Sequence, residues 1–234
     1  MGLATWWRNL QAGGPSGGQA PGALRYTVLD SELTGLDERS DDIVSLGALH
    51  MQGGRIELGQ AFQELVKPSA ALDGRSVLIH GITPGQVEAM PPIEAALAAL
   101  RAYAEGTVLV GHCLAIDLGF LNRDARRLKH PAFKHPAVDT LALYGWLRHR
   151  GAEHPAFSLE VAQPSLFDLA AAFDIQVEAA HSALGDAYVT AQLFQRLLPL
   201  LVPTGVHTLA SLRRVGDPAR AVSRMGAAPG QAHF

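Results

Sequence analysis

The chain has little of several features that mark broad classes of protein. Cys113 is the only cysteine among 234 residues, which excludes an internal disulfide and fits the reducing environment of the cytoplasm. No apolar run approaches the roughly 18 residues of a membrane span. No basic region followed by an apolar stretch marks a secretory signal. We therefore expect a cytoplasmic protein with no membrane partner.

Positive charge is not in excess either. The net charge is −3 at neutral pH, whereas proteins that hold long nucleic acids by neutralising many phosphates are usually basic. A chain of this charge that handles nucleic acid should grip a short stretch or an end, with metal ions supplying much of the positive charge. The hydrophobic content of 48% is enough for a sizeable core.

The order of expected elements indicates an α/β fold. Strands are expected at 25–29, 43–50 and 56–66, and short turns join them. Strands and helices then alternate, with strands at 107–110 and 138–140 and helices at 93–104, 115–128, 140–147, 166–173 and 182–198. This pattern predicts a mixed five-stranded sheet, three antiparallel strands followed by parallel additions, flanked by helices.

Three regions are expected along the chain. Residues 1–22 are interpreted as a flexible lead, whose Trp6-Trp7 tip is either disordered or a docking segment for a partner or second subunit. Residues 23–202 form the main domain. Residues 203–234, with arginines among glycines, prolines and alanines, are expected to be a partly ordered tail. The oligomeric state is left open.

Two carboxylates stand where the first predicted strand runs out. Asp30 and Glu32 are separated by one residue, and an extended segment points residues i and i+2 to the same face. Two acids held that close repel each other and shift each other's pKa unless a cation or a proton lies between them. This arrangement favours a bound metal.

Two later segments supply what such a metal site needs. Asp117 falls in the first or second turn of a predicted helix, and Asp186 lies on a helix for which Ser182 is a plausible cap. Four carboxylates suit Mg²⁺ or Mn²⁺, and a pair of such ions can clamp the attacking and leaving oxygens of a phosphodiester displacement. His181, in the loop before the last helix, could take a proton from water.

The order Asp-x-Glu, Gly-His-x₄-Asp and His-x₄-Asp resembles the DEDDh exonucleases, the family of the proofreading epsilon subunit of bacterial DNA polymerase III. The segment His80-Gly81-Ile82-Thr83 resembles the family's HGIT segment, and Val138-Asp139-Thr140 resembles its strand followed by Asp-Thr. The resemblance covers about residues 25–198. It implies a ribonuclease H-like fold and 3′-to-5′ removal of nucleotides with two Mg²⁺ or Mn²⁺ ions.

The resemblance also implies roles for individual residues. Asp30, Glu32 and Asp186 would bind metal, with Asp30 bridging the ions. Asp117 would hold the second ion, directly or through water, and His181 would be the general base. The chain departs from the usual pattern at Leu33, Cys113 and Ile116, none of which is a ligand. These departures leave the shape of the nucleotide pocket open.

Substrate contacts are expected next to these motifs. The candidates are Leu33, Thr34, Gly35, Leu36, His80 and Phe120. For His80 a helix cap at Thr83 is an alternative explanation of the segment. We interpret Asp139 as a structural residue. Residues 163–167 resemble a sliding-clamp peptide, but the amphipathic pattern that follows predicts a helix whose apolar face enters the core.

These observations favour a metal-dependent 3′–5′ exonuclease that acts on single-stranded ends, with DNA as the expected substrate. An oligoribonucleotide or RNA-trimming exonuclease on the same scaffold is the alternative, because no residue indicates whether a 2′-hydroxyl is accepted. A non-catalytic module that binds nucleic acid or a polymerase is disfavoured, since all five active-site positions carry competent side chains. A polymerase or a repair complex remains a possible partner.

Overall fold

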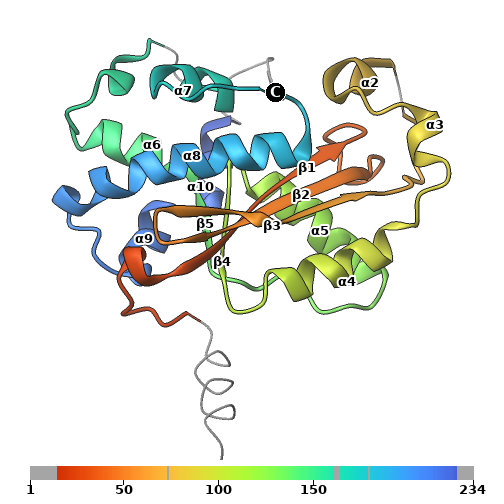
Figure 1. The fold of residues 1–234 in the computed structure, drawn as a ribbon, viewed down its shortest axis with the longest axis horizontal. Coiled ribbons are helices and arrows are strands. Elements are labelled where there is room, and N and C mark those ends of the chain that lie inside the picture. Colours follow the sequence, from red (N-terminus) through yellow and green to blue (C-terminus); the bar gives the residue numbers. More distant parts are fainter. Residues whose placement is uncertain (1–14, 73, 161–163, 179, 226–234) are drawn as a thin grey trace, which may run out of the picture.

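A computed structural model describes residues 15–72, 74–160, 164–178 and 180–225, and one five-stranded sheet forms its centre (Figure 1). The strands are β1 (Arg25–Leu33), β2 (Ile43–Gln52), β3 (Arg55–Leu65), β4 (Val108–Gly111) and β5 (Ala137–Asp139). They lie in the order β3-β2-β1-β4-β5. The first three pair antiparallel, and β4 and β5 join in parallel. The predicted fold class is confirmed.

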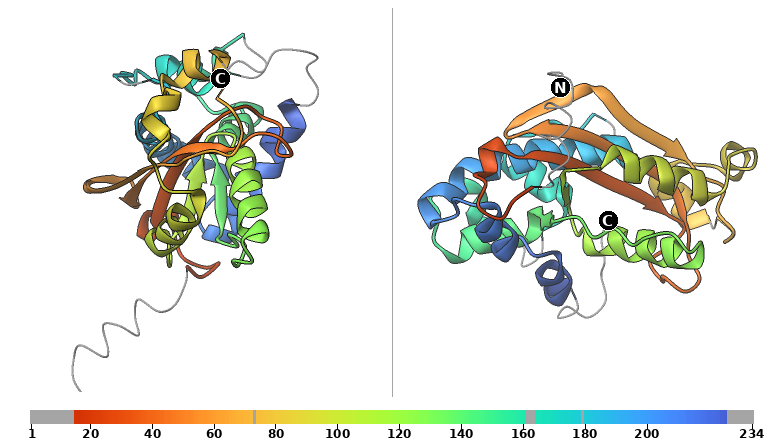
Figure 2. Two further views of the ribbon diagram at one scale, coloured as in Figure 1. Left: turned by 90° about the vertical axis from the view of Figure 1, so that its right-hand side faces the viewer. Right: turned by 90° about the horizontal axis from the view of Figure 1, so that it is seen from below.

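Helices cover both faces of this sheet (Figures 1 and 2). The described α-helices are α2 (Gly74–His80), α3 (Pro84–Val87), α4 (Ile93–Tyr103), α5 (Ala115–Arg127), α6 (Thr140–His149), α7 (Leu166–Ala172), α8 (Ala183–Leu201), α9 (Leu209–Val215) and α10 (Pro218–Met225). Short 3₁₀ turns occur at Pro21–Ala23, Pro155–Ser158 and Val202–Thr204. One core lies between the sheet and α6 to α9, and a second lies between the sheet and α4 and α5.

Alternation along β1 assigns its side chains to these two cores. Tyr26 and Val28 belong to the core under α8, whereas Leu29 belongs to the core under α4 and α5. Because successive strand side chains point to opposite faces, Asp30 and Glu32 continue the α8 side and Ser31 continues the α5 side. The strand does not end at Leu29 as expected, since β2 goes on supplying backbone partners as far as Leu33.

The C-terminal end of β1 is not paired with β4, the strand on the side of β1 opposite β2. Among the described residues β4 pairs with β1 only from Tyr26 to Val28, and β4 itself ends at Gly111. Asp30 and Glu32 therefore lie within β1, at a level of the sheet that β4 does not reach. A helix that follows β4 can reach them from the second core, and α5 starts four residues later.

Gly47 lets the start of α8 lie directly on the sheet. This glycine pairs with Asp30 across β1 and β2. A Cβ atom at Gly47 would overlap the backbone of Ala183 and Leu184. Only a residue without a side chain allows this approach, and the approach brings Asp186, in the first turn of α8, beside β1.

Gly47→Ala is therefore expected to push α8 away from the sheet. We expect a loss of about 1–3 kcal/mol in the free energy of unfolding, as for other overpacked cores. The exonuclease activity that the motifs predict should fall by about 10²-fold, because displacing a catalytic group by ~1 Å costs about that much. Urea unfolding and a nuclease assay measure both effects. Gly59→Ala is the control, since no atom lies within 4 Å of a Cβ there; equal behaviour of the two variants would contradict this explanation.

Segments on both sides of the expected main domain make contacts with it. At the N-terminal side, the backbone of α9 donates to the carbonyls of Gly17 and Gln19, at 2.9 and 2.8 Å. These bonds tie residues 17 and 19, which the sequence assigned to a flexible lead, to the C-terminal part of the domain. Trp6 and Trp7 lie outside the described residues.

The described part of the C-terminal segment, expected as a partly ordered tail, contributes apolar residues to the core. Leu209, Leu212 and Val215 are buried in the core under α8. Thr208 and Ser211 form a capping box that starts α9. The spacing of the three apolar residues makes an amphipathic stripe, which the neighbouring arginines obscured in the sequence.

Within the described residues, none of the helices has both the length and the apolar character needed to cross a membrane.

Candidate active site

Three of the predicted metal ligands meet at the open end of β1. Asp30 and Glu32 on β1 and Asp186 on α8 each offer a carboxylate oxygen, and these oxygens lie within 4.8 Å of one another. Ser182 caps α8 by accepting a hydrogen bond from the Gly185 backbone at 3.2 Å. We refer to Asp30, Glu32 and Asp186 as the carboxylate cluster.

Burial and mutual repulsion make this cluster hold protons unusually tightly. Burial, followed by repulsion from Asp186 and Asp117, raises the pKa of Glu32 to about 7. Burial raises the pKa of Asp186 to about 6, and burial with three neighbouring acids raises that of Asp30 well above its usual value. Hard divalent cations prefer such oxygen ligands. A cation bound among these oxygens would replace the protons and remove the repulsion.

Asp117 lies outside the carboxylate cluster, but its charge contributes to the raised pKa values of Asp30 and Glu32. It stands in the first turn of α5 and is buried, at 6% exposed. Ser31 donates its hydroxyl proton to Asp117 Oδ1 at 2.5 Å. Burial raises the pKa of Asp117 to about 7, although the Ser31 hydrogen bond opposes this rise. Ser31 was missed in the sequence, because its partner is 86 positions away.

His181 is held at the start of α8 by two contacts. Its backbone N–H donates to Asp186 Oδ1 at 3.2 Å, and its φ of +60° is uncommon for a residue with a side chain. Its ring packs edge to face on Phe167, with centroids 5.0 Å apart.

The segment that resembles a sliding-clamp peptide continues into α7, and its residues Leu166 and Phe173 are buried. The apolar face of α7 therefore enters the core, and Phe167 contacts the candidate base.

Asp139 holds the start of α5 through a hydrogen bond to its side chain. It is fully buried, and its carboxylate accepts from the backbone of Leu114 at 2.7 Å and of Ala142 at 3.0 Å. Its own N–H donates to the carbonyl of Gly216 at 2.8 Å. One side chain thus orients the helix that carries Asp117 and caps α6. This geometry agrees with the structural role that we inferred for Asp139.

The expected substrate contacts differ in how accessible they are. Leu36 is 45% exposed, and Leu33 and Gly35 are half-buried, so these three can form a rim beside the cluster. Thr34 is buried, and its hydroxyl is engaged by Asp41 and by the backbone N–H of Asp42. Leu36 therefore presents most of the exposed surface of the rim.

Two further expectations fall on α5 and α2. Phe120 is 0% exposed and belongs to the core under α4 and α5, so its expected contact with substrate is wrong. The sequence could not show which face of α5 turns inward. His80 is nearly buried, its Nδ1 accepts from the Ile82 backbone at 3.0 Å, and its Nε2 has no hydrogen-bond partner among the described residues. Burial lowers the pKa of His80.

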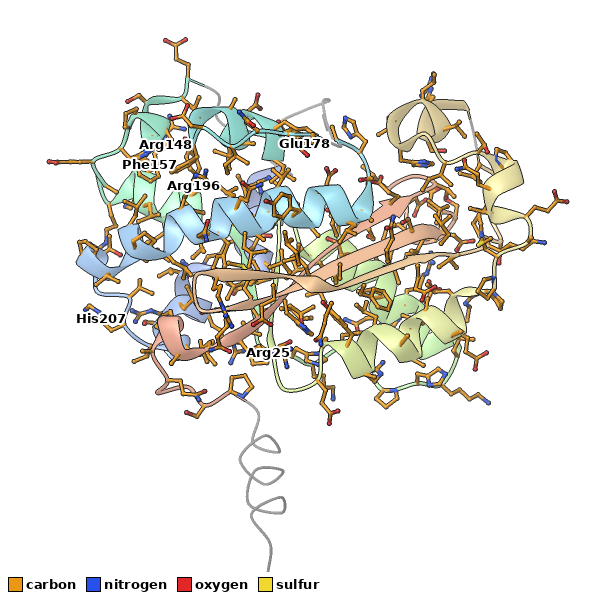
Figure 3. The ribbon with its side chains drawn as sticks, viewed as in Figure 1. Arg25, Arg148, Phe157, Glu178, Arg196 and His207 are labelled. Carbon is orange, nitrogen blue, oxygen red and sulfur yellow. The ribbon has the colours of Figure 1, made fainter. Side chains whose placement is uncertain are left out.

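Among the described residues, the arginine on α8 lies away from the carboxylate cluster. Arg196 is on α8 itself, ten residues beyond Asp186, which corresponds to about 15 Å along the helix. Figure 3 shows Arg148 and Arg196 beside the part of α8 that lies away from its N-terminal end. This distance keeps the positive charge of Arg196 away from the carboxylate cluster.

Comparison with known proteins decides the family. The sequence profile of the RNase T exonuclease family matches residues 27–194. The chain belongs to this exonuclease family. The match confirms the resemblance drawn from the three motifs. Its limits enclose Asp30, Glu32, Asp117, His181 and Asp186.

The curated relatives described here are named as DNA polymerase III epsilon or epsilon-like proteins. A DNA polymerase III subunit epsilon-like protein of Rhodobacter capsulatus is 35% identical over 81% of this chain and 26% of its own length. The DNA polymerase III subunit epsilon of Aquifex aeolicus is 28% identical over 81% of this chain and 89% of its own length. The chain thus spans about a quarter of the Rhodobacter protein and most of the Aquifex one.

Solved exonucleases share the fold. Escherichia coli exonuclease I in complex with a dT13 oligonucleotide has a TM-score of 0.65 at 19% identity, over 77% of this chain and 42% of the other. Exonuclease X in complex with 5′ overhanging duplex DNA has a TM-score of 0.58 at 18% identity, over 82% and 99%. At these identities the likeness shows the fold.

Proposed function

We propose that this chain is a metal-dependent 3′–5′ exonuclease that removes nucleoside monophosphates from single-stranded DNA ends. The observation that carries the proposal is the convergence of Asp30, Glu32 and Asp186 within 4.8 Å, with Asp117 and His181 beside them. A cluster of buried ionised acids is costly unless cations or protons are bound there. The exonuclease family supplies the reaction for which such a site is suited.

The donor set fits two Mg²⁺ or Mn²⁺ ions. Asp30, Glu32 and Asp186 would hold one ion, and Asp30 and Asp117 would hold the other. When bound, such ions stabilise the charge that develops on the phosphodiester oxygens. His181 would accept a proton from the attacking water at its imidazole nitrogen. The backbone hydrogen bond from His181 to Asp186 keeps the base next to the ligands.

The form of the substrate follows from the buried position of the ligands. Glu32 and Asp186 are both 8% exposed, so a single strand can bring its terminal phosphodiester to them more easily than a duplex can. Both solved relatives described above were captured with DNA, which supports DNA over RNA here. RNA trimming is the alternative that the assay below separates, and the relatives' names support a polymerase as a partner.

End-labelled single strands test this proposal. With Mg²⁺ or Mn²⁺, a 5′-labelled DNA strand should shorten in single-nucleotide steps, while a 3′-labelled strand should release its label at once as a mononucleotide. EDTA should abolish both. An RNA strand of the same sequence should be cut more slowly. Release of the label from the 5′ end, or no cleavage with either ion, would refute the proposed function.

A further inference from the structure

Arg123 on α5 ties the loop between β1 and β2 to the helix that carries Asp117. Its guanidinium donates to the carbonyls of Glu38 and Asp41 in that loop and to the carboxylate of Asp42 at 3.0 Å. It also donates twice to Asp124, at 3.2 and 3.0 Å. An arginine has five N–H donors, so all of them are used.

The surroundings make this contact rigid. The Arg123 side chain is 20% exposed and that of Asp124 is 2% exposed. The guanidinium lies 4.9 Å from the centroid of the Phe120 ring, which fills the core beneath it. The nearby carboxylates of Asp124 and Asp42 raise the pKa of Arg123, outweighing the effect of its burial. Planar, bidentate pairing of this kind is specific to arginine, because lysine offers only three donors from one nitrogen.

The loop that Arg123 holds begins with the expected substrate rim. Residues 33–36 follow Glu32 directly, and Leu36 is 45% exposed. Internal bonds make residues 34–42 a compact unit: the Thr34 backbone donates to the Asp42 carbonyl at 2.9 Å, and the Asp37 backbone donates to Asp41 Oδ2 at 2.9 Å. Fixing the Asp41 and Asp42 end of this unit therefore fixes the rim as well.

A second contact sets the same loop on α5 one turn earlier. Gly119 precedes Arg123 by four residues, so the two share a face of the helix. A Cβ atom at Gly119 would overlap the carboxylate of Glu38. The loop is thus held on α5 at Gly119 and Arg123, while Ser31 is bonded to Asp117 at the start of the helix.

We propose that Arg123 is a positioning residue that sets the rim formed by Leu33, Gly35 and Leu36 for the terminal nucleotides of the substrate. It acts through the loop and contacts neither the carboxylate cluster nor, in this role, the substrate. The proposal rests on the proposed function, because the rim matters only if a nucleic acid end binds there.

The test compares Arg123→Lys with Arg127→Gln on two substrates. Arg127 lies one turn further along α5, is 53% exposed and pairs with Asp124 at 3.3 Å, so it is the matched control. One substrate is a single-stranded DNA oligonucleotide. The other is bis(p-nitrophenyl) phosphate, a phosphodiester without a nucleoside that reports on the metal centre alone. Urea unfolding is measured for each protein.

For Arg123→Lys we expect the KM for the oligonucleotide to rise about tenfold, while kcat and the hydrolysis of the small diester stay near wild type. Arg127→Gln should match wild type on both substrates. An unchanged KM in Arg123→Lys would overturn the proposal, because a positive charge alone would then be enough to position the rim. An equal loss on both substrates would also overturn it, because the damage would lie in the metal centre or the fold. Failure of the wild-type protein to cut DNA would count against the proposed function instead.

Discussion

Asp186→Asn is expected to lower kcat by about 10⁴-fold and, at the same time, to stabilise the metal-free protein. Activity should fall because a proposed metal ligand is lost, and several kcal/mol of stabilisation of the transition state should be lost with it. Stability rises because one of several mutually repelling buried acids is removed. The amide oxygen of asparagine can still accept the hydrogen bond from the His181 backbone, so the start of α8 should be preserved.

The raised pKa values also predict how the free energy of unfolding changes with pH. The pKa values of Glu32 and Asp117 are raised to about 7 and that of Asp186 to about 6, whereas unfolded acids titrate near pH ~4. Between these limits the folded state binds more protons than the unfolded state. The free energy of unfolding of the metal-free protein should therefore fall as the pH rises from about 4 to about 7.

Urea unfolding in EDTA at about pH 5 and about pH 7.5 checks both statements. At the higher pH, Asp186→Asn should exceed wild type by about 1–3 kcal/mol, and its dependence on pH should be weaker. Adding Mn²⁺ should reverse the order, because ions stabilise the state that binds them. A variant that is less stable than wild type in EDTA at the higher pH would show that the acids do not repel one another as described.

His181→Gln is expected to lower kcat by about 10³-fold while leaving metal binding intact. A general base contributes roughly 10²–10⁴-fold, and glutamine cannot accept a proton from water. The variant keeps the backbone N–H that donates to Asp186, so the carboxylate cluster should stay in place. Mn²⁺ affinity by calorimetry and single-turnover cleavage of a labelled strand separate the two effects.

His149→Gln is the matched control for this experiment. His149 ends α6 and is exposed, so the change should leave both measurements at the wild-type value. Loss of Mn²⁺ binding in His181→Gln would mean that the loop before α8, rather than the imidazole, carries the effect. Unimpaired cleavage would remove His181 from the role of general base.

The sequence predicted those parts of the site that depend on local spacing. Strand alternation placed Asp30 and Glu32 on one face, and a capping serine placed Asp186 in the first turn of a helix. The five strands and their pairing followed from turn signals and from the alternation of strands and helices. These inferences hold because backbone geometry over a few residues decides them.

The parts that the sequence could not supply depend on contacts between distant segments. Arg123 meets its loop partners across more than 80 positions, and no local pattern marks that contact. The role of Gly47 depends on where α8 lies, because a glycine within a strand pattern has several possible reasons. Phe120 was misassigned because its face of α5 turns toward the second core, and α9 was missed because charged neighbours masked its apolar stripe.

Titration calorimetry with Mn²⁺ tests the central claim most directly, that the carboxylate cluster and Asp117 together hold divalent ions. We predict two Mn²⁺ ions per chain for the wild-type protein. Asp30→Asn, which alters the expected bridging ligand, should lose both, while Asp37→Asn, in the exposed part of the loop after β1, should retain both. Absence of Mn²⁺ binding by the wild-type protein, or equal binding by Asp30→Asn, would contradict the account.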